Sequence, residues 1–206
     1  MGIAMVSQIK RGVLDLIGGA RPSIADPFLP NKVREGREDE IRECIGCNIC
    51  ISSWHDGVPV RCTQNATAGE EWRKGWHPEK FDSPGSNDRI LIVGGGPAGL
   101  EAALVAAKRG YRVAIADKAS EMGGRLLFET RLPGLNSWSR VQDYRLYALQ
   151  QMGNVDIYTD SELGVEEVFA LEYQRVAIAT GARWTRALYS SLEIPVGELN
   201  MPNVFT

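Results

Sequence analysis

The residues best suited to chemistry in this 206-residue chain are its four cysteines, Cys44, Cys47, Cys50 and Cys62. The first three follow the pattern C-x2-C-x2-C, and the fourth comes after eleven further residues. Three close thiolates and one remote thiolate can bind the four irons of a cubane cluster. Gly46 allows the tight backbone turn that such a loop needs. The spacing therefore predicts that the four cysteines ligate one [4Fe–4S] cluster.

Two other interpretations of the cysteines stay open: a structural zinc site, and buried cysteines that bind no metal. A four-cysteine zinc site usually has two separated C-x2-C pairs rather than a triple, although His55 could replace one cysteine as a ligand. A secreted disulfide framework is disfavoured, because it would spread its cysteines over a short chain.

A glycine-rich segment, Gly94 to Gly99, fits the dinucleotide-binding pattern G-x-G-x-x-G. It follows a predicted strand and opens a predicted helix, as that motif requires. Gly94 would make the turn, Gly96 would let the backbone approach a pyrophosphate, and Gly99 would allow close helix–strand packing. The loop residues assigned to the nucleotide site are Gly94, Gly96, Pro97, Ala98 and Gly99. A glycine-rich turn without a ligand is the alternative.

Other candidate nucleotide contacts follow later strands. Asp117 ends the second predicted strand of this region, where its carboxylate can accept hydrogen bonds from an adenosine ribose and would repel a 2′-phosphate. Gly124 and Arg125 could form a further contacting loop, and residues 179–182 end a later strand. Each of these two segments could be only a turn, and Arg125 could be a solvated surface arginine.

The apolar pattern predicts an α/β fold with a Rossmann-like parallel sheet. Strands are expected at residues 13–17, 89–93, 112–116, 155–158 and 175–179. Helices are expected from Asp26-Pro27 to Gly36, with Asp26 as the N-cap, along the apolar stripe of residues 100–107, and over 137–152. Turn-forming residues at 83–87 suggest a boundary. The expected domains are residues 1–36, a cysteine module at 37–82 and a nucleotide-binding domain at 83–206.

The composition argues against several classes of partner. Lys and Arg number 23 and Asp and Glu number 26, a net charge of −3, so the chain has no basic field for nucleic acid or anionic lipid. No apolar run is free enough of charge, glycine and proline to span a bilayer, and the N-terminus lacks the secretory pattern. We expect a soluble cytoplasmic protein with no nucleic-acid or membrane partner.

Three segments carry a resemblance to a known family: residues 41–50 (IRECIGCNIC), 62–71 (CTQNATAGEE) and 75–80 (GWHPEK). They are similar to the iron–sulfur region of the trimethylamine, dimethylamine and histamine dehydrogenases, one branch of the old yellow enzyme and dienoyl-CoA reductase flavoproteins. The resemblance covers nearly the whole chain. The related reductases carry one more residue between the second and third cysteines, so the spacing here favours the amine dehydrogenase branch.

The resemblance implies that the chain is a C-terminal fragment of a larger enzyme. It would begin near the eighth strand of an FMN-binding (β/α)8 barrel, continue through the iron–sulfur module and end, at residues 202–206, inside an incomplete Rossmann-like domain. Gly19, Ala20 and Arg21 match the family's clamp on the FMN phosphate, although Arg21 could be an ordinary surface arginine. The catalytic acids and bases would lie in the missing barrel portion, so no catalytic residue is assigned.

The implied parent enzyme oxidises a small amine and passes electrons from FMN through the [4Fe–4S] cluster to an electron-transferring flavoprotein. The amine dehydrogenase branch binds ADP at the glycine loop, and the parent is expected to be a homodimer. One alternative is an NADPH-dependent dienoyl-CoA or enoate reductase relative with FAD at that loop. A second is a non-enzymatic electron carrier or a zinc-stapled nucleotide-binding module. Alone, this chain is expected not to turn over amines.

Overall fold

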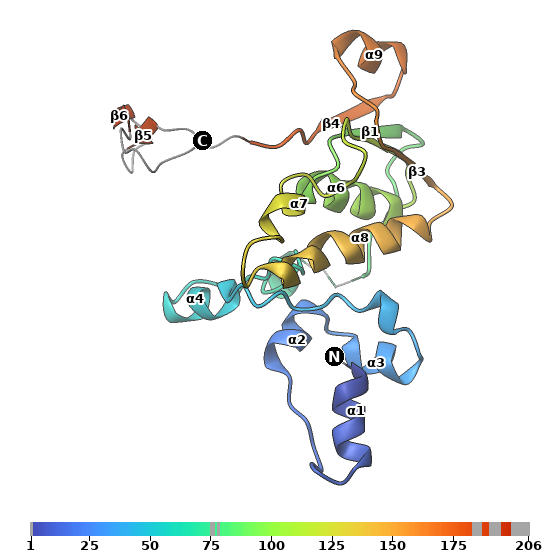
Figure 1. The fold of residues 1–206 in the computed structure, drawn as a ribbon. Helices are drawn as coiled ribbons and strands as arrows, with labels where there is room; N and C mark the ends of the chain where they lie inside the picture. The colour runs from blue at the N-terminus through green and yellow to red at the C-terminus, as the bar shows by residue number, and fades with distance from the viewer. Residues whose placement is uncertain (1, 75–76, 78, 183–186, 190–194, 199–206) are drawn as a thin grey trace.

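The computed structural model describes residues 2–74, 77, 79–182, 187–189 and 195–198. It contains a four-stranded parallel sheet, which lies in the upper part of Figure 1, above the N-terminal helices. The strands are β1 (Arg89–Val93), β2 (Arg112–Ala116), β3 (Val155–Tyr158) and β4 (Arg175–Ile178), in the order β3-β2-β1-β4. Val93, the last residue of β1, pairs with Ala116 on one side and Ile178 on the other. The carboxyl ends of three strands therefore meet at one edge, and the predicted α/β class is confirmed.

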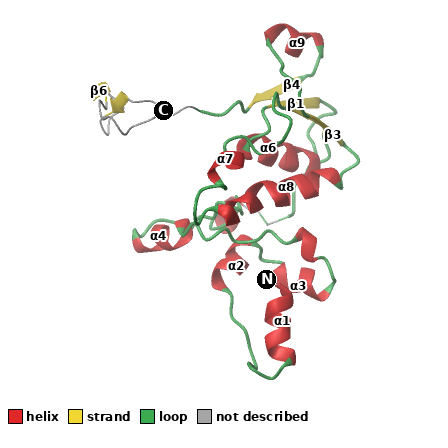
Figure 2. Cartoon of the chain, in the orientation of Figure 1, coloured by secondary structure: helices red, strands yellow, loops and turns green. Residues whose placement is uncertain are grey.

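Helices lie on both faces of this sheet (Figure 2). α6 (Pro97–Lys108) and α8 (Arg140–Gln150) pack together on one face, where the predicted stripe of Leu100, Ala103, Leu104 and Ala107 is buried against Ile92 and Ile115. The other face is formed by alternate strand residues, Leu91, Val93 and Ala114, which pack against Val168 of α9 (Val165–Ala170).

The expected barrel strand at residues 13–17 is wrong. The N-terminal part consists of α1 (Gly2–Lys10), α2 (Ala20–Ala25), α3 (Leu29–Arg34) and the 3-10 turn η1 (Glu38–Glu40). Val13 to Ile17 is an irregular segment between α1 and α2, and Leu16 is 87% exposed. An isolated strand cannot satisfy its backbone N–H and C=O groups, and none of the described strands pairs with this segment.

The helix expected to begin at Asp26-Pro27 begins instead at Leu29, with Phe28 as its N-cap. The carboxylate of Asp26 accepts a hydrogen bond from the Phe28 amide at 3.0 Å, but it also accepts one from Lys32 Nζ at 2.9 Å. Asp26 is completely buried. Its role is therefore that of a buried ion-pair partner rather than that of a helix cap. The helix ends at Arg34, close to the predicted stop at Gly36.

The remaining elements are short. They are α4 (Ile49–His55), α5 (Glu71–Lys74), α7 (Leu126–Glu129), the 3-10 turn η2 (Asn136–Ser139) and an antiparallel pair, β5 (Ala187–Tyr189) and β6 (Pro195–Glu198). The pair β5–β6 was not predicted, and the helix expected over 137–152 is divided between η2 and α8. The predicted break at residues 202–206 falls outside the described residues, and the three domain limits stay predictions. Among the described helices, none is long and apolar enough to cross a bilayer.

Candidate functional site

The glycine loop occupies the predicted position between β1 and α6. Packing explains why two of its three motif glycines must be glycine. A Cβ on Gly94, whose φ is +111°, would lie 2.3 Å from the carbonyl oxygen of Ala179. A Cβ on Gly99 would lie 1.9 Å from the carbonyl oxygen of Gly94. A Cβ on Gly96, the N-cap of α6, would meet no described atom within 4 Å. Gly94 and Gly99 are thus required by packing, whereas Gly96 leaves open space before the free N–H groups of α6.

Asp117 lies at the end of β2 with its carboxylate against the glycine loop. Oδ2 accepts a hydrogen bond from the Gly95 amide at 2.5 Å, and Oδ1 accepts one from the Ala119 amide at 2.8 Å. Each carboxylate oxygen can accept more than one hydrogen bond, so both can still bind a hydroxyl group. The bond to Gly95 was not predicted, and it shows that Asp117 also braces the loop.

The two other candidate segments, around Gly124 and at residues 179–182, both contact the glycine loop. The Gly123 amide donates to the Gly95 carbonyl at 2.8 Å, and a Cβ on Gly124 would lie 3.1 Å from the Cα of Gly96. Arg125 forms an ion pair with Glu129 one helical turn later. Ala179 donates to the Val93 carbonyl at 2.7 Å and therefore borders the loop from β4. The site lies where β2 and β4 flank β1 on opposite sides, the switch point at which parallel sheets of this kind bind ligands.

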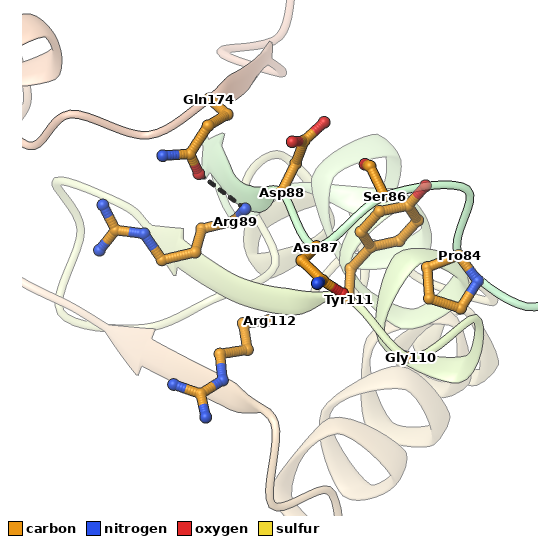
Figure 3. A pocket seen from close by; sticks show the side chains of 9 residues that line it. All are labelled: Pro84, Ser86, Asn87, Asp88, Arg89, Gly110, Tyr111, Arg112 and Gln174. Carbon is orange, nitrogen blue, oxygen red and sulfur yellow. Dashed lines mark hydrogen bonds between the residues drawn. The ribbon is translucent and has the colours of Figure 1, made fainter.

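A second hollow lies at the opposite ends of the strands and does not belong to this site (Figure 3). It has a volume of about 530 Å³, and its lining includes Arg89 and Arg112, paired residues at the starts of β1 and β2. In Figure 3 the amide oxygen of Gln174 faces the backbone nitrogen of Arg89, and the two are joined by a hydrogen bond of 2.9 Å. Because ligands of such folds bind beyond the carboxyl ends of the strands, this hollow is not a candidate nucleotide site.

The four cysteines lie in one region, around α4, and all four are half-buried free thiols. Cys44 and Cys47 precede α4, Cys50 lies in its first turn, and Cys62 follows it. Amides point at two of the sulfurs, because Gly46 N donates to Cys44 Sγ and Gln64 N donates to Cys62 Sγ, each at 3.4 Å.

The surroundings of Cys62 shift the pKa of its thiol. Burial raises the pKa of the Cys62 thiol. The amides of Asn65 and Gln64 act in the opposite direction, and nearby Cys47 and Cys44 add to the rise.

Positive φ angles at Gly46 (+72°) and Asn48 (+60°) fold the loop between Cys44 and Cys50 tightly.

The donor set, three closely spaced cysteines and one remote cysteine, is of the kind that binds a cubane cluster. Among the described residues, no group of three or more Cys, His, Asp or Glu side chains is placed to hold one metal ion. A structural zinc site needs four ligands at about 2.0–2.3 Å from one ion. A cubane cluster instead distributes its four thiolates over four irons, and sulfur-directed amides are typical of such centres. The four cysteines could hold that cluster.

The predicted FMN-phosphate residues lie beside the cysteines. A hollow of about 630 Å³ is lined by Gly19, Ala20 and Arg21 together with Cys50 and Trp54. Arg21 Nη1 donates to Asn48 Oδ1 at 2.7 Å, so the arginine is tied to the cysteine loop itself. Asn48 was missed in the sequence, although an Asn inside a C-x2-C-x2-C loop is a signal for a left-handed turn.

Comparisons with known proteins identify relatives of this chain. The family model for pyridine nucleotide-disulphide oxidoreductases matches residues 88–200. Dimethylamine dehydrogenase from Hyphomicrobium sp. (strain x) is 46% identical over 98% of this chain, which spans 29% of that protein.

Two solved structures are also similar. One is 6-hydroxypseudooxynicotine amine oxidase from Pseudomonas geniculata N1, with a TM-score of 0.89 and 56% identity, covering 97% of this chain and 30% of that one. The other is histamine dehydrogenase from Rhizobium sp. 4-9, with a TM-score of 0.88 and 50% identity, covering 93% of this chain and 28% of that one. The chain thus spans less than a third of the length of these relatives, which are oxidoreductases. The predicted resemblance to the amine dehydrogenase branch is confirmed, and the chain belongs to the pyridine nucleotide-disulphide oxidoreductase family.

Proposed function

We propose that this chain supplies the electron-transfer and adenine-nucleotide-binding parts of an amine dehydrogenase. In such an enzyme FMN takes two electrons from a small amine, and a [4Fe–4S] cluster passes them singly to an electron-transferring flavoprotein. Cys44, Cys47, Cys50 and Cys62 would hold the cluster. Gly19, Ala20 and Arg21 would contribute the phosphate contacts of FMN.

The observation that carries this proposal is the hollow shared by Arg21 and Cys50. Two redox groups can exchange electrons only if the protein holds them close together. The candidate phosphate clamp and a candidate cluster ligand line the same hollow, and Arg21 is hydrogen-bonded to Asn48, between Cys47 and Cys50. A guanidinium group suits a phosphate because it donates several parallel hydrogen bonds.

The glycine loop would bind the adenosine diphosphate part of a nucleotide. The open space at Gly96 would admit the pyrophosphate to the N-terminus of α6, and the carboxylate of Asp117 would accept the ribose hydroxyls. Bound ADP would stabilise the folded chain by mass action.

Anaerobic reconstitution of the purified chain with iron and sulfide tests the proposal. We expect about four irons and four sulfides per chain with broad visible absorption, and binding of ADP measured by calorimetry. A Cys47→Ser variant should take up less iron, and a Ser52→Ala variant in α4 serves as the matched control.

Three other results would contradict the proposal. Stoichiometric zinc without sulfide, after purification under iron-replete anaerobic conditions, would favour the zinc-stapled module. Retention of FAD rather than ADP at the glycine loop would favour the reductase alternative. Absence of any nucleotide binding would leave the glycine loop as a structural turn.

A further inference from the structure

Gln64 is buried next to a candidate cluster ligand, and all of its side-chain polar groups are used. The side chain is 1% exposed. Nε2 donates to the carbonyl oxygens of Glu43 at 3.0 Å and Arg140 at 3.2 Å, and Oε1 accepts a hydrogen bond from Arg145 Nη1 at 2.8 Å. Its backbone amide donates to Cys62 Sγ. Gln64 therefore joins the Cys62 segment to the residue that precedes Cys44 and to α8.

Arg145, in the middle of α8, is the charged partner of this amide. It is 4% exposed and is separated from Gln64 by 81 positions in the sequence. Nε donates to Glu101 Oε2 at 2.7 Å, and Nη1 also donates to the Val141 carbonyl at 2.8 Å. A buried charge is costly unless it is paired and hydrogen-bonded, and Arg145 meets both conditions in one fixed orientation. Through Glu101 the network reaches α6, the helix that opens at the glycine loop.

Residues of η2 and α8 also hold the segment that carries Cys44. Arg140 Nη1 donates to the Cys44 carbonyl at 3.0 Å, and Ser137 Oγ donates to the Ile45 carbonyl at 3.2 Å. Ile45 is buried against Leu126 and Val141. Both cysteine segments are thus fixed by residues of η2 and α8, which belong to the nucleotide-binding region rather than to the cysteine module.

We propose that Gln64 and Arg145 are positioning residues for the metal centre. They set the separation between the Cys62 segment and the Cys44 segment, and with it the retention and the reduction potential of the cluster. Outer groups that orient ligands commonly change metal affinity 10- to 100-fold when they are removed. This inference rests on the proposed function, in which the four cysteines hold a cluster.

Two variants separate positioning from ordinary packing. Gln64→Glu keeps the length of the side chain and an acceptor for Arg145, but it has no donor for the carbonyls of Glu43 and Arg140. Arg145→Met keeps much of the apolar volume but removes the guanidinium. Arg112→Met, at an exposed arginine that begins β2 on the strand ends opposite the glycine loop, is the matched control.

The reconstituted full chain and its variants are compared by three measurements. The first is the rate of loss of visible absorption in air, the second is the midpoint potential from a titration followed by EPR of the reduced cluster, and the third is thermal unfolding by circular dichroism. We expect Gln64→Glu and Arg145→Met to lose the cluster about 10- to 100-fold faster than the wild type. Both should shift the midpoint potential and the EPR g values, and Arg112→Met should match the wild type in all three measurements.

The double variant should lose the cluster faster than either single variant, because Gln64→Glu removes the hydrogen bonds to the carbonyls of Glu43 and Arg140, whereas Arg145→Met removes the separate bond to residue 64 and leaves the new carboxylate buried without its cation. If the wild type binds a cluster while Gln64→Glu keeps the same loss rate, potential and EPR spectrum, the inference is overturned and the proposed function stands. Gln64→Glu also decides the question if Arg145→Met does not fold. Failure of the wild type to bind iron and sulfide overturns the proposed function and this inference together.

Discussion

The carboxylate of Asp117 lies 2.5 Å from the backbone nitrogen of Gly95, so an acid at the end of β2 holds the glycine loop that follows β1. The same carboxylate accepts a hydrogen bond from the Ala119 amide at 2.8 Å. An acid predicted to bind a ribose thus also shapes the loop that would bind the phosphates.

Replacing Asp117 by Ala should weaken both ADP binding and folding. Charge-assisted hydrogen bonds contribute about 1.5–3 kcal/mol each, so loss of the ribose contacts should reduce ADP affinity at least tenfold. Loss of the bonds to Gly95 and Ala119 should lower the free energy of unfolding by about 1–3 kcal/mol. Calorimetry and urea unfolding measure the two effects, with Asp156→Ala, at an exposed position of β3, as the control. Unchanged ADP affinity would remove Asp117 from the nucleotide site.

Alanine at Gly99 should lower the stability of the chain, whereas alanine at Gly96 should lower only its affinity for ADP. A Cβ at Gly99 would clash with the Gly94 carbonyl, so Gly99→Ala should lower the free energy of unfolding by at least about 1–3 kcal/mol. A Cβ at Gly96 meets no described atom and φ there is −74°, so Gly96→Ala should fold normally. It should nevertheless bind ADP weakly, because the added methyl group occupies the space proposed for the pyrophosphate. Wild-type ADP affinity in Gly96→Ala would place the phosphates elsewhere.

The parallel sheet could be predicted from the sequence because its strands are short, mostly apolar segments bounded by glycines or polar residues. The stripe on α6 could be predicted for a similar reason, since the period of its apolar residues is that of a helix. The segment at residues 13–17 has the same apolar character, yet it is not a strand. Strand formation depends on a hydrogen-bonding neighbour, and no local pattern supplies one.

In the candidate site, too, local patterns could be predicted from the sequence and tertiary contacts could not. The cysteines and glycines could be proposed as site residues because the patterns that suggest them are local spacings. Gln64 and Arg145 could not, because nothing in the spacing predicts a contact across 81 positions. Asp26 was misread as a helix cap because its ion pair with Lys32 depends on tertiary burial.

Replacing Asn48 in the cysteine loop by alanine should lower the stability of the chain more than replacing it by glycine. Its φ of +60° is left-handed, a conformation that costs most residues about 1–2 kcal/mol but costs glycine little. Asn48→Ala should therefore destabilise the chain by about that amount, whereas Asn48→Gly should unfold at nearly the wild-type urea concentration. Equal destabilisation of the two variants would show that the hydrogen bond to Arg21, rather than the backbone, is what Asn48 contributes.

Removing the charge of Lys32 should cause a large loss of stability, because Lys32 neutralises the buried acid Asp26. Nζ donates to Asp26 at 2.9 Å, to Glu79 at 2.6 Å and to the Glu40 carbonyl at 3.0 Å. Lys32→Met would leave the carboxylate of Asp26 buried without its cation, which should cost about 3–5 kcal/mol. Lys118→Met removes an exposed lysine 4.0 Å from Glu162 and should change stability by less than about 1 kcal/mol. Urea unfolding at pH 7 measures both.

The contribution of Lys32 should also depend on pH in a defined direction. Burial alone would lower the pKa of Lys32, but hydrogen bonds to Glu79 and Asp26 raise it above the ordinary value of 10.5. Because the folded state then holds the proton more tightly than the unfolded state, the stabilisation is fully present below pH 10.5 and disappears as the pH rises through the folded-state pKa. The difference in unfolding free energy between wild type and Lys32→Met should thus be constant from pH 7 to about pH 10 and shrink above it. A difference that grows as the pH is raised would mean that the charged ammonium group destabilises this site.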